Sequence, residues 1–196
     1  MKKITVIIIV VVIFIFGIWA IVSYNGLVET SENAKTSWSN VESSYQRRND
    51  LIGNLVKTVQ GAADFEKNTL VEVQEARSKA TSITIDPTNI TPENMAEFQK
   101  AQSGLTGALN KLMVSVENYP DLKANQNFLE LQSQLEGTEN RINVERNKFN
   151  ETVNIHNKKT KTFPSVITAK LFGFDEMGRF EAEQGAEKAP DVEFNF

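Results

Sequence analysis

The sequence predicts an all-α protein, in which an N-terminal transmembrane helix is followed by an antiparallel bundle of three long helices plus a short fourth helix. Three observations support this prediction. A run of apolar residues fills positions 4–22. Apolar side chains then recur at alternating steps of three and four, and no segment shows the sustained two-residue alternation of a strand. Long helices joined by short turns close as an antiparallel bundle.

The apolar run at residues 4–22 has the length of a membrane span. Only Thr5 and Gly17 interrupt it, and at about 1.5 Å per residue it covers roughly 28 Å, close to the hydrocarbon thickness of a bilayer. A cleaved signal sequence is the competing interpretation, but the run is longer than a usual signal core and no A-x-A step follows it. We therefore expect residues 1–23 to remain as a single-pass anchor that contacts membrane lipid.

Charge gives an expected orientation and excludes one class of partner. Lys2 and Lys3 precede the span, whereas only Lys35 lies in the twenty residues after it, so the positive-inside rule favours a cytoplasmic N-terminus and an extracytoplasmic bundle, with a cytoplasmic bundle as the alternative. Removing Lys2 and Lys3 from the 21 basic residues leaves 19 against 25 acidic residues, a net charge of −6. Because nucleic-acid binding needs a concentrated basic surface, we expect no nucleic-acid partner.

The body begins with a long amphipathic segment. No proline interrupts residues 24–86, so we predict one helix of about fifty residues or more that continues from the membrane segment. Gly26, Gly53 and Gly61 are its weak points, and Glu66 is a polar break in its seam. The seam comprises Leu27, Ala34, Trp38, Val41, Tyr45, Arg48, Ile52, Leu55, Val59, Ala62, Val73, Ala76, Ala80 and Ile83.

Further helices follow a proline-containing turn. Residues 91–93, Thr-Pro-Glu, fit an N-cap, a first-turn proline and a first-turn acid, and they start a second helix of about 25 residues that stops before Pro120. A third helix is predicted to end near Asn157, and residues 165–172 form a short fourth helix ended by Gly173. The predicted apolar positions are Met95, Phe98, Leu105, Leu109, Leu112, Val116, Phe128, Leu131, Leu135, Ile142, Phe149 and Val153, with Gln102 on the same seam.

The C-terminal region differs in composition. In residues 174–196 acidic residues outnumber basic ones, and two glycines and a proline occur, which is typical of a tail. The expected organisation is an anchor at 1–23, a helical-bundle domain at 24–173 and an acidic tail at 174–196. Residues 192–196 alternate apolar and polar, so two interpretations stay open: extended docking on the bundle or a partner, and a frayed terminus.

The chain has few residues suited to catalysis. It has no cysteine and one histidine, which removes thiolate chemistry and multi-histidine metal sites. A di-iron bundle enzyme needs Glu-x-x-His pairs, but Val153 stands three residues before His156. We therefore expect no enzyme activity, no cofactor and no metal, and we interpret His156 as a hydrogen-bonded packing residue.

Two polar features remain after the core is assigned. Arg48 occupies a seam position, where a buried guanidinium needs a carboxylate, and Glu139 is the candidate partner. A register-fixing polar layer is the more conservative interpretation of this pair. A second feature is a stripe of asparagines beside the apolar face of the third helix, which suggests amides used in packing or recognition, although a solvated face is the alternative. The stripe comprises Asn140, Asn143, Asn147, Asn150, Asn154 and Asn157.

Several short motifs, spread over nearly the whole chain, occur together in a combination that is typical of one protein family. They include Arg47-Arg48-x-Asp50-Leu51-Ile52-x-Asn54-Leu55, Tyr119-Pro120-Asp121-Leu122-Lys123-Ala124, Thr138-Glu139-Asn140-Arg141-Ile142, Asn150 and Phe163-Pro164. The most specific stretch is residues 117–142, which generic coiled-coil composition would not reproduce. In this combination the chain resembles the LemA family of bacterial membrane proteins, which have an N-terminal transmembrane helix, a helical bundle and a poorly defined biochemical role.

The resemblance implies a bacterial cell membrane location. It also implies a membrane peptidase as one candidate protein partner, since family members are often encoded near membrane zinc peptidases. The family's usual proline before Asn54 is Gly53 here, which replaces a fixed kink with a flexible position. The motifs and polar features give our structural or interaction candidates: Arg47, Arg48, Asp50, Asn54, Tyr119, Pro120, Asp121, Glu139, Asn140, Arg141, Asn150 and Asn157.

These observations favour a binding protein over an enzyme. Our leading hypothesis is a membrane-anchored scaffold or adaptor that binds protein partners through the bundle surface, the asparagine stripe or the C-terminal residues. The alternative is a self-associating structural spacer of the cell envelope, in which heptads make homo-oligomeric contacts.

Overall fold

A computed structural model of the chain describes residues 2–61 and 65–181. Within these residues the backbone forms helices and no strand, which confirms the predicted all-α fold class. The helices are α1 (Lys2–Gln60), α2 (Lys67–Ser82), α3 (Pro92–Val116), α4 (Pro120–Lys123), α5 (Gln126–Lys161) and α6 (Ser165–Phe172).

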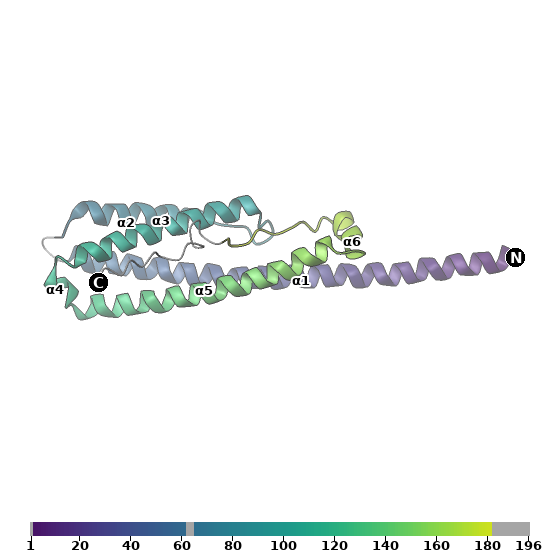
Figure 1. The fold of residues 1–196 in the computed structure, drawn as a ribbon, viewed down its shortest axis with the longest axis horizontal. Coiled ribbons are helices and arrows are strands. Elements are labelled where there is room, and N and C mark those ends of the chain that lie inside the picture. The colour runs from purple at the N-terminus through teal and green to yellow at the C-terminus, as the bar shows by residue number, and fades with distance from the viewer. Residues whose placement is uncertain (1, 62–64, 182–196) are drawn as a thin grey trace, which may run out of the picture.

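Helix α1 is one unbroken helix of 59 residues. Its N-terminal part extends alone beyond the bundle (Figure 1), and the apolar side chains there are exposed. Among the described helices, α1 alone is long and apolar enough to cross a membrane. The same helix continues into the bundle through Leu27, Trp38 and Ile52, all of which are fully buried. The candidate span and the bundle therefore share one continuous backbone.

The prediction of a single helix from residue 24 to about residue 83 is wrong. Helix α1 ends at Gln60, and α2 begins at Lys67 and runs back in the opposite direction (Figure 1). The break falls beside Gly61, one of the predicted weak points, and Glu66, the predicted polar break, which is the extended N-cap residue of α2. Phe65 is buried in the turn against the Tyr119 ring, at 4.9 Å between centroids. Folding back buries the seams of both helices, which one straight helix could not do.

Later helix boundaries follow the predicted signals. The Thr91 side chain caps α3 in a capping box with Asn94, and Pro92 occupies the first turn. Helix α6 covers residues 165–172, and Gly173 ends it in the left-handed conformation at φ 71°. Helix α5 continues to Lys161, one turn beyond the predicted end near Asn157.

The bundle contains four substantial helices arranged in two antiparallel pairs. Helix α1 packs along α5, and α2 packs along α3, while α6 lies across α1 and α5 (Figure 1). The additional helix, compared with the prediction, is α2, which the break at residue 61 separates from α1. The break thus converts a predicted three-helix bundle into a four-helix bundle with a short crossing helix.

Two hydrophobic cores occupy the bundle. The core farther from the candidate span, here called the distal core, is mainly aliphatic and includes Ile52, Leu55, Leu105, Leu112 and Phe128. The core nearer the span, here called the proximal core, is richer in aromatic side chains. It includes Trp38, Tyr45, Phe98, Phe149 and Phe180.

Candidate functional site

A polar layer crosses the bundle between the two cores. Arg48 of α1 is 4% exposed. Its Nη1 donates to Glu139 Oε2 of α5 at 3.0 Å, and its Nη2 donates to Gln102 Oε1 of α3 at 2.6 Å. Gln102 in turn donates from Nε2 to the carbonyl oxygen of Ala80 in α2, at 3.2 Å. The layer therefore joins all four long helices at one level.

The ion pair between Arg48 and Glu139 agrees with the partner predicted from sequence. Its two side chains differ in environment, since that of Arg48 is 5% exposed and that of Glu139 is 45% exposed. The Tyr45 ring lies 4.8 Å from the guanidinium carbon, and burial raises the pKa of the Tyr45 hydroxyl. Because the buried guanidinium has acceptors on several helices, a shift of helix register would separate it from them and cost free energy. This arrangement favours a structural role for the layer.

The second polar site is formed by a segment that the sequence assigned to the tail. Residues 174–181, here called the C-terminal strap, follow α6 and run without helical structure along the bundle between α3 and α5 (Figure 1). Phe180 of the strap is 4% exposed and packs in the proximal core. Its ring centroid lies 5.8 Å from that of Phe149 and 6.2 Å from that of Trp38. The strap therefore completes this core.

Side-chain amides hold the strap by its main chain. Asn157 accepts from the Met177 N–H at 2.9 Å and donates to the Met177 carbonyl at 2.8 Å. Asn150 makes the same pair of bonds to Phe180, both at 2.9 Å. From the opposite side, Gln99 of α3 bonds both main-chain groups of Glu181. Each amide supplies one donor and one acceptor, as a neighbouring β-strand would.

The spacing of these contacts has a simple geometric cause. Asn150 and Asn157 are seven residues apart on α5, which is roughly 10.5 Å along a helix. Met177 and Phe180 are three residues apart on the strap, which is roughly 10 Å along an extended chain. The distance spanned by two turns of α5 therefore matches the distance spanned by three extended residues of the strap. In this strap the N–H and carbonyl groups of Met177 and Phe180 therefore both reach α5.

Gly178 determines how closely the strap can approach α3. Its N–H donates to the Ile90 carbonyl at 2.9 Å. A Cβ atom at this position would collide with the carbonyl group of Thr91, which is main chain and cannot rotate away. Only glycine fits such a close approach between two backbones.

The asparagine stripe divides into two parts. Asn150, Asn154 and Asn157 all contact the strap, Asn154 through the Arg179 side chain at 3.0 Å. The use of amides in packing or recognition, one of the two interpretations of the stripe, describes its C-terminal half, where the amides pack against the strap of the same chain. The other members are exposed: Asn140, Asn143 and Asn147.

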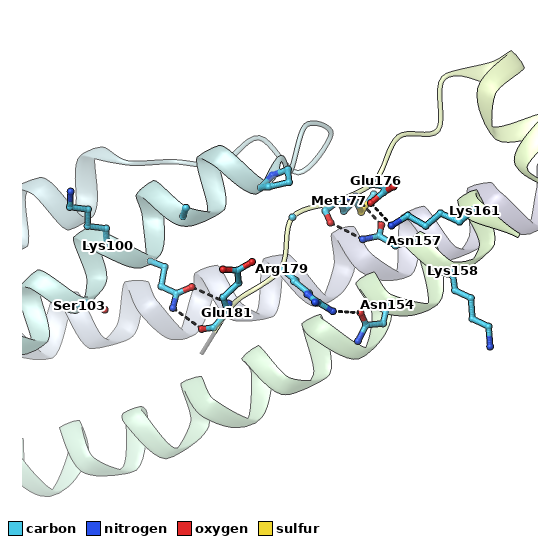
Figure 2. A pocket seen from close by; sticks show the side chains of 14 residues that line it. Lys100, Ser103, Asn154, Asn157, Lys158, Lys161, Glu176, Met177, Arg179 and Glu181 are labelled. Carbon is cyan, nitrogen blue, oxygen red and sulfur yellow. Dashed lines mark hydrogen bonds and ion pairs between the residues drawn. The ribbon is translucent and has the colours of Figure 1, made fainter. Parts of the chain in front are cut away.

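An open groove remains beside the strap. Its volume is about 950 Å³. Helices α3 and α5 form its walls and the strap forms its floor (Figure 2), and Lys161 pairs with Glu176 across one end at 2.7 Å. The lining residues are Pro92, Ala96, Gln99, Lys100, Ser103, Asn154, Asn157, Lys158, Lys161, Glu176, Met177, Gly178, Arg179 and Glu181.

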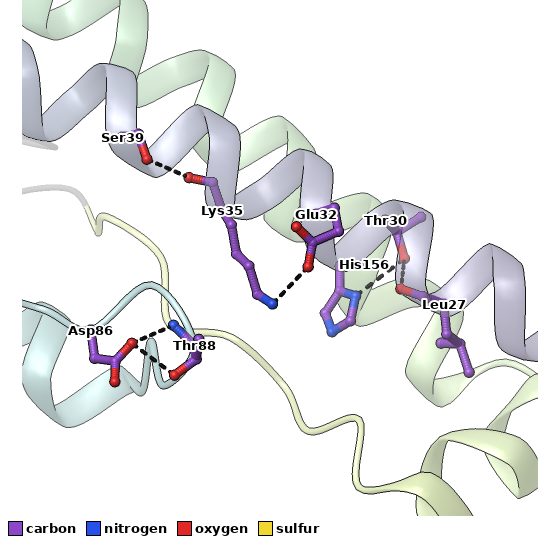
Figure 3. A network of polar contacts seen from close by, with 8 residues as sticks. All are labelled: Leu27, Thr30, Glu32, Lys35, Ser39, Asp86, Thr88 and His156. Carbon is purple, nitrogen blue, oxygen red and sulfur yellow. Dashed lines mark hydrogen bonds and ion pairs between the residues drawn. The ribbon is translucent and has the colours of Figure 1, made fainter.

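His156 ties α5 to both α1 and the strap. It is 1% exposed, with Nε2 3.1 Å from the Asp175 carbonyl oxygen and Nδ1 3.2 Å from Thr30 Oγ1 (Figure 3). Since a carbonyl oxygen only accepts, Nε2 carries the proton in the contact with Asp175. The Thr30 hydroxyl beside Nδ1 also donates to the Leu27 carbonyl oxygen, at 3.0 Å. Desolvation by burial lowers the pKa of His156, and Lys159 and Lys35 add to this effect. These contacts confirm the predicted hydrogen-bonded packing role.

The remaining sequence candidates lie away from the strap. Arg47, Asp50 and Arg141 line a second groove between α1 and α5, of about 740 Å³. Asp50 and Asn54 line a third groove between α1 and α2. The distal turn holds the last three candidates: the half-buried Tyr119 packs on the distal core, and the exposed Pro120 and Asp121 start α4.

Gly53 provides space for an arginine. Helix α1 passes through this position without a break, and the Arg77 side chain of α2 lies against it, where a Cβ atom would be 3.1 Å from Cζ. Arg77 Nε donates to the Asn49 carbonyl at 2.8 Å. The glycine thus permits a side chain from α2 to bond the main chain of α1.

Sequence reasoning missed three residues of the strap site: Gln99, Gly178 and Phe180. The seven-residue separation of Asn150 and Asn157 was the available signal, together with a glycine two residues before a phenylalanine in an otherwise polar tail. Within residues 2–61 and 65–181 no group of three or more His, Cys, Asp or Glu side chains is arranged to hold a metal ion.

Comparisons with known proteins match most of the chain. The model of the LemA family matches residues 37–194. The chain is 24% identical over 160 residues to protein LemA of Metamycoplasma hominis, which covers 82% of this chain and 69% of that protein. It is 26% identical over 174 residues to the magnetosome protein MamQ of Magnetospirillum gryphiswaldense, covering 80% of this chain and 64% of that protein.

A magnetosome protein of Paramagnetospirillum magneticum, MamQ 2, is 25% identical over 175 residues, again with 64% of its own length covered. The chain therefore spans less than two thirds of the MamQ proteins that it matches. The family match includes the polar layer, the amides of α3 and α5 and the strap that they hold. By this match the chain belongs to the LemA family of membrane-associated proteins.

Proposed function

We propose that this protein is a membrane-anchored scaffold or adaptor, and that its partner-binding surface is the groove between α3 and α5. The observation that carries the proposal is the mode in which the strap is held. Asn150, Asn157 and Gln99 bond main-chain groups, so this part of the bundle is built to hold an extended chain. The open volume beside the strap can take a second extended segment.

The charge of the groove indicates what kind of segment it fits. Lys100, Lys158 and Arg179 line it together with Lys161, which is paired with Glu176. With Glu181 included, four basic side chains face two acidic ones. A partner segment with an excess of acidic side chains complements this surface. The partner class is therefore an extended acidic protein segment, and a membrane peptidase with such a segment remains one candidate.

Anchoring is the second part of the proposal. Residues 4–22 would cross the membrane, and the uninterrupted α1 would hold the groove at a fixed distance from the bilayer. The lysines before the span favour an extracytoplasmic bundle. The side of the membrane on which the bundle lies can be tested with a cysteine introduced at Ser133, which is exposed on α5. An impermeant maleimide should label this cysteine in intact cells. Labelling only after lysis would place the bundle in the cytoplasm.

Site-specific photo-crosslinking in cell membranes tests the groove. A photoreactive residue replaces Ala96, which is exposed on the groove wall, and a matched variant carries it at Ser133, which is exposed outside the groove. We expect a discrete adduct with a different protein from position 96 and not from position 133. Lys100→Glu should weaken that adduct, whereas Lys148→Glu, outside the groove, should leave it unchanged.

The alternative function gives a different result in the same experiment. A self-associating spacer would yield only adducts between copies of this chain. An adduct pattern that is the same from both positions, or one insensitive to Lys100→Glu, would contradict partner binding in this groove.

A further inference from the structure

Helix α6 presents an apolar surface at the end of the bundle where the candidate span begins. The Phe172 and Phe174 rings lie 4.9 Å and 5.7 Å from the Tyr24 ring of α1, measured between centroids. Tyr24 is only two residues beyond the end of the apolar run at 4–22. Two residues of helix rise roughly 3 Å. Helix α6 therefore lies at the level where α1 would leave the hydrocarbon layer.

The outer side chains of α6 are large, apolar and exposed. Leu171 is 75% exposed, and Phe172 and Ile167 are also exposed. Phe163, in the turn before α6, is 77% exposed. Other exposed apolar residues of the bundle, such as Val114 and Val144, lie singly on separate helices. A cluster at one end of the molecule marks a contact surface, whereas scattered residues do not.

Basic side chains accompany this apolar cluster. Lys158 and Lys161 are exposed in the last turn of α5, and Lys170 is exposed on α6. The nearby acids are Asp175 and Glu176, and Glu176 is paired with Lys161. Lysines beside exposed apolar side chains are the composition of segments that lie in the interface of an anionic bilayer.

We propose that α6 is a second membrane contact, whose exposed apolar side chains enter the headgroup layer of the leaflet from which α1 emerges. This inference rests on the proposed membrane anchor. It commits to a lipid surface because the cluster is continuous in space with the candidate span and carries the complementary charge.

Depth-dependent fluorescence quenching tests the proposal in the full chain. Because the protein has no cysteine, Leu171→Cys carries a single environment-sensitive label in vesicles of phosphatidylcholine and phosphatidylglycerol. Val114→Cys is the matched control, since Val114 is 72% exposed at the far end of α3. We expect the label at position 171 to emit at shorter wavelength than the label at position 114, and to be quenched by lipids with a headgroup-proximal spin label.

A third variant separates the inference from the anchor on which it rests. A label at Val12→Cys, within the apolar run, should be quenched by lipids spin-labelled deep in the acyl chains. Quenching at position 12 without quenching at position 171 would overturn the α6 contact and leave the anchor intact. No quenching at either position would overturn the anchor itself. A blue-shifted but unquenched label at position 171 would mean that protein covers this face, which also overturns the proposal.

Discussion

Side chains of helices build almost all of the distal core, with Phe65 added from the turn before α2, whereas the proximal core is completed by the extended C-terminal strap. The distal core collects aliphatic residues from α1, α2, α3 and α5 at regular helical spacing. The proximal core is an aromatic cluster of Trp38, Phe98, Phe149 and Phe180, in which Phe180 comes from the strap. The distal half of the bundle is thus closed without the C-terminal strap, whereas the proximal half needs Phe180 of the strap to complete its core.

The two halves also differ in how polar groups are used. In the proximal half, amides of α3 and α5 bond the strap main chain, and His156 bonds its first residues. The polar layer around Arg48 lies between the halves, and we expect the halves to respond separately to substitution.

Removal of the strap aromatic should give the largest effect. Phe180→Ala leaves a cavity in the proximal core and is expected to lower the free energy of unfolding by about 3–5 kcal/mol. Urea unfolding of the full chain in detergent micelles measures this loss. Hydrogen exchange should show faster exchange of the Met177 and Phe180 amides, because the strap is released.

A matched substitution in the distal core sharpens this prediction. Leu112→Ala, also at a fully buried position, should lower the free energy of unfolding by about 2–5 kcal/mol. It should leave exchange of the strap amides unchanged. If both variants accelerate strap exchange equally, the two halves do not behave separately.

An intermediate effect is expected from the polar layer. Glu139→Leu leaves the buried Arg48 guanidinium without its carboxylate and should destabilise the protein by about 1–3 kcal/mol. Arg48→Met should cost less, about 1 kcal/mol, because the remaining Glu139 is partly exposed and regains water. Thermal unfolding of both variants measures the order. The reverse order would show that the layer does not protect a buried charge.

The smallest effect concerns pH. Burial lowers the pKa of His156 below the ordinary value of 6.5, so the unfolded chain binds a proton that the folded chain resists. The stability contributed by neutral His156 is therefore fully present above about pH 6.5 and declines as the pH falls toward the lowered pKa. We expect the melting temperature to fall between about pH 7 and about pH 5.5, partly through this group.

His156→Gln is the control for the pH effect. Glutamine keeps hydrogen-bonding capacity but does not titrate, so its melting temperature should fall less over the same pH range. Parallel curves for the two proteins would assign the pH dependence to other groups.

Most of the helical architecture could be predicted from sequence because it depends on local periodicity. The seam residues from Leu27 to Val59 are buried where the three-and-four spacing places them. The capping residues of α3 and the glycine that ends α6 act within a few residues of their own positions. The Arg48 and Glu139 pair was predictable because a buried charge requires a partner at the same level of the bundle.

The strap and the break after α1 could not be predicted in the same way. The strap has no helical period, and its stability comes from Gln99, Asn150 and Asn157, which are distant in the sequence and become neighbours only after folding. Gly61 and Glu66 marked a place where the helix could break, but the break itself follows from the gain in burial when α2 packs on α3, which residues distant in the sequence provide. Residues 192–196, for which docking and fraying were both considered, lie outside the described residues.

In a membrane, the unbroken α1 would make the anchor and the bundle tilt together as one rigid rod. From residue 23 to residue 60 the helix extends roughly 55 Å beyond the end of the apolar run. A tilt of about 20°, typical of membrane helices, would displace its far end sideways by roughly 20 Å. A bilayer that becomes thinner or thicker changes this tilt. The height and lateral reach of the distal end would then depend on the thickness of the membrane in which the helix stands.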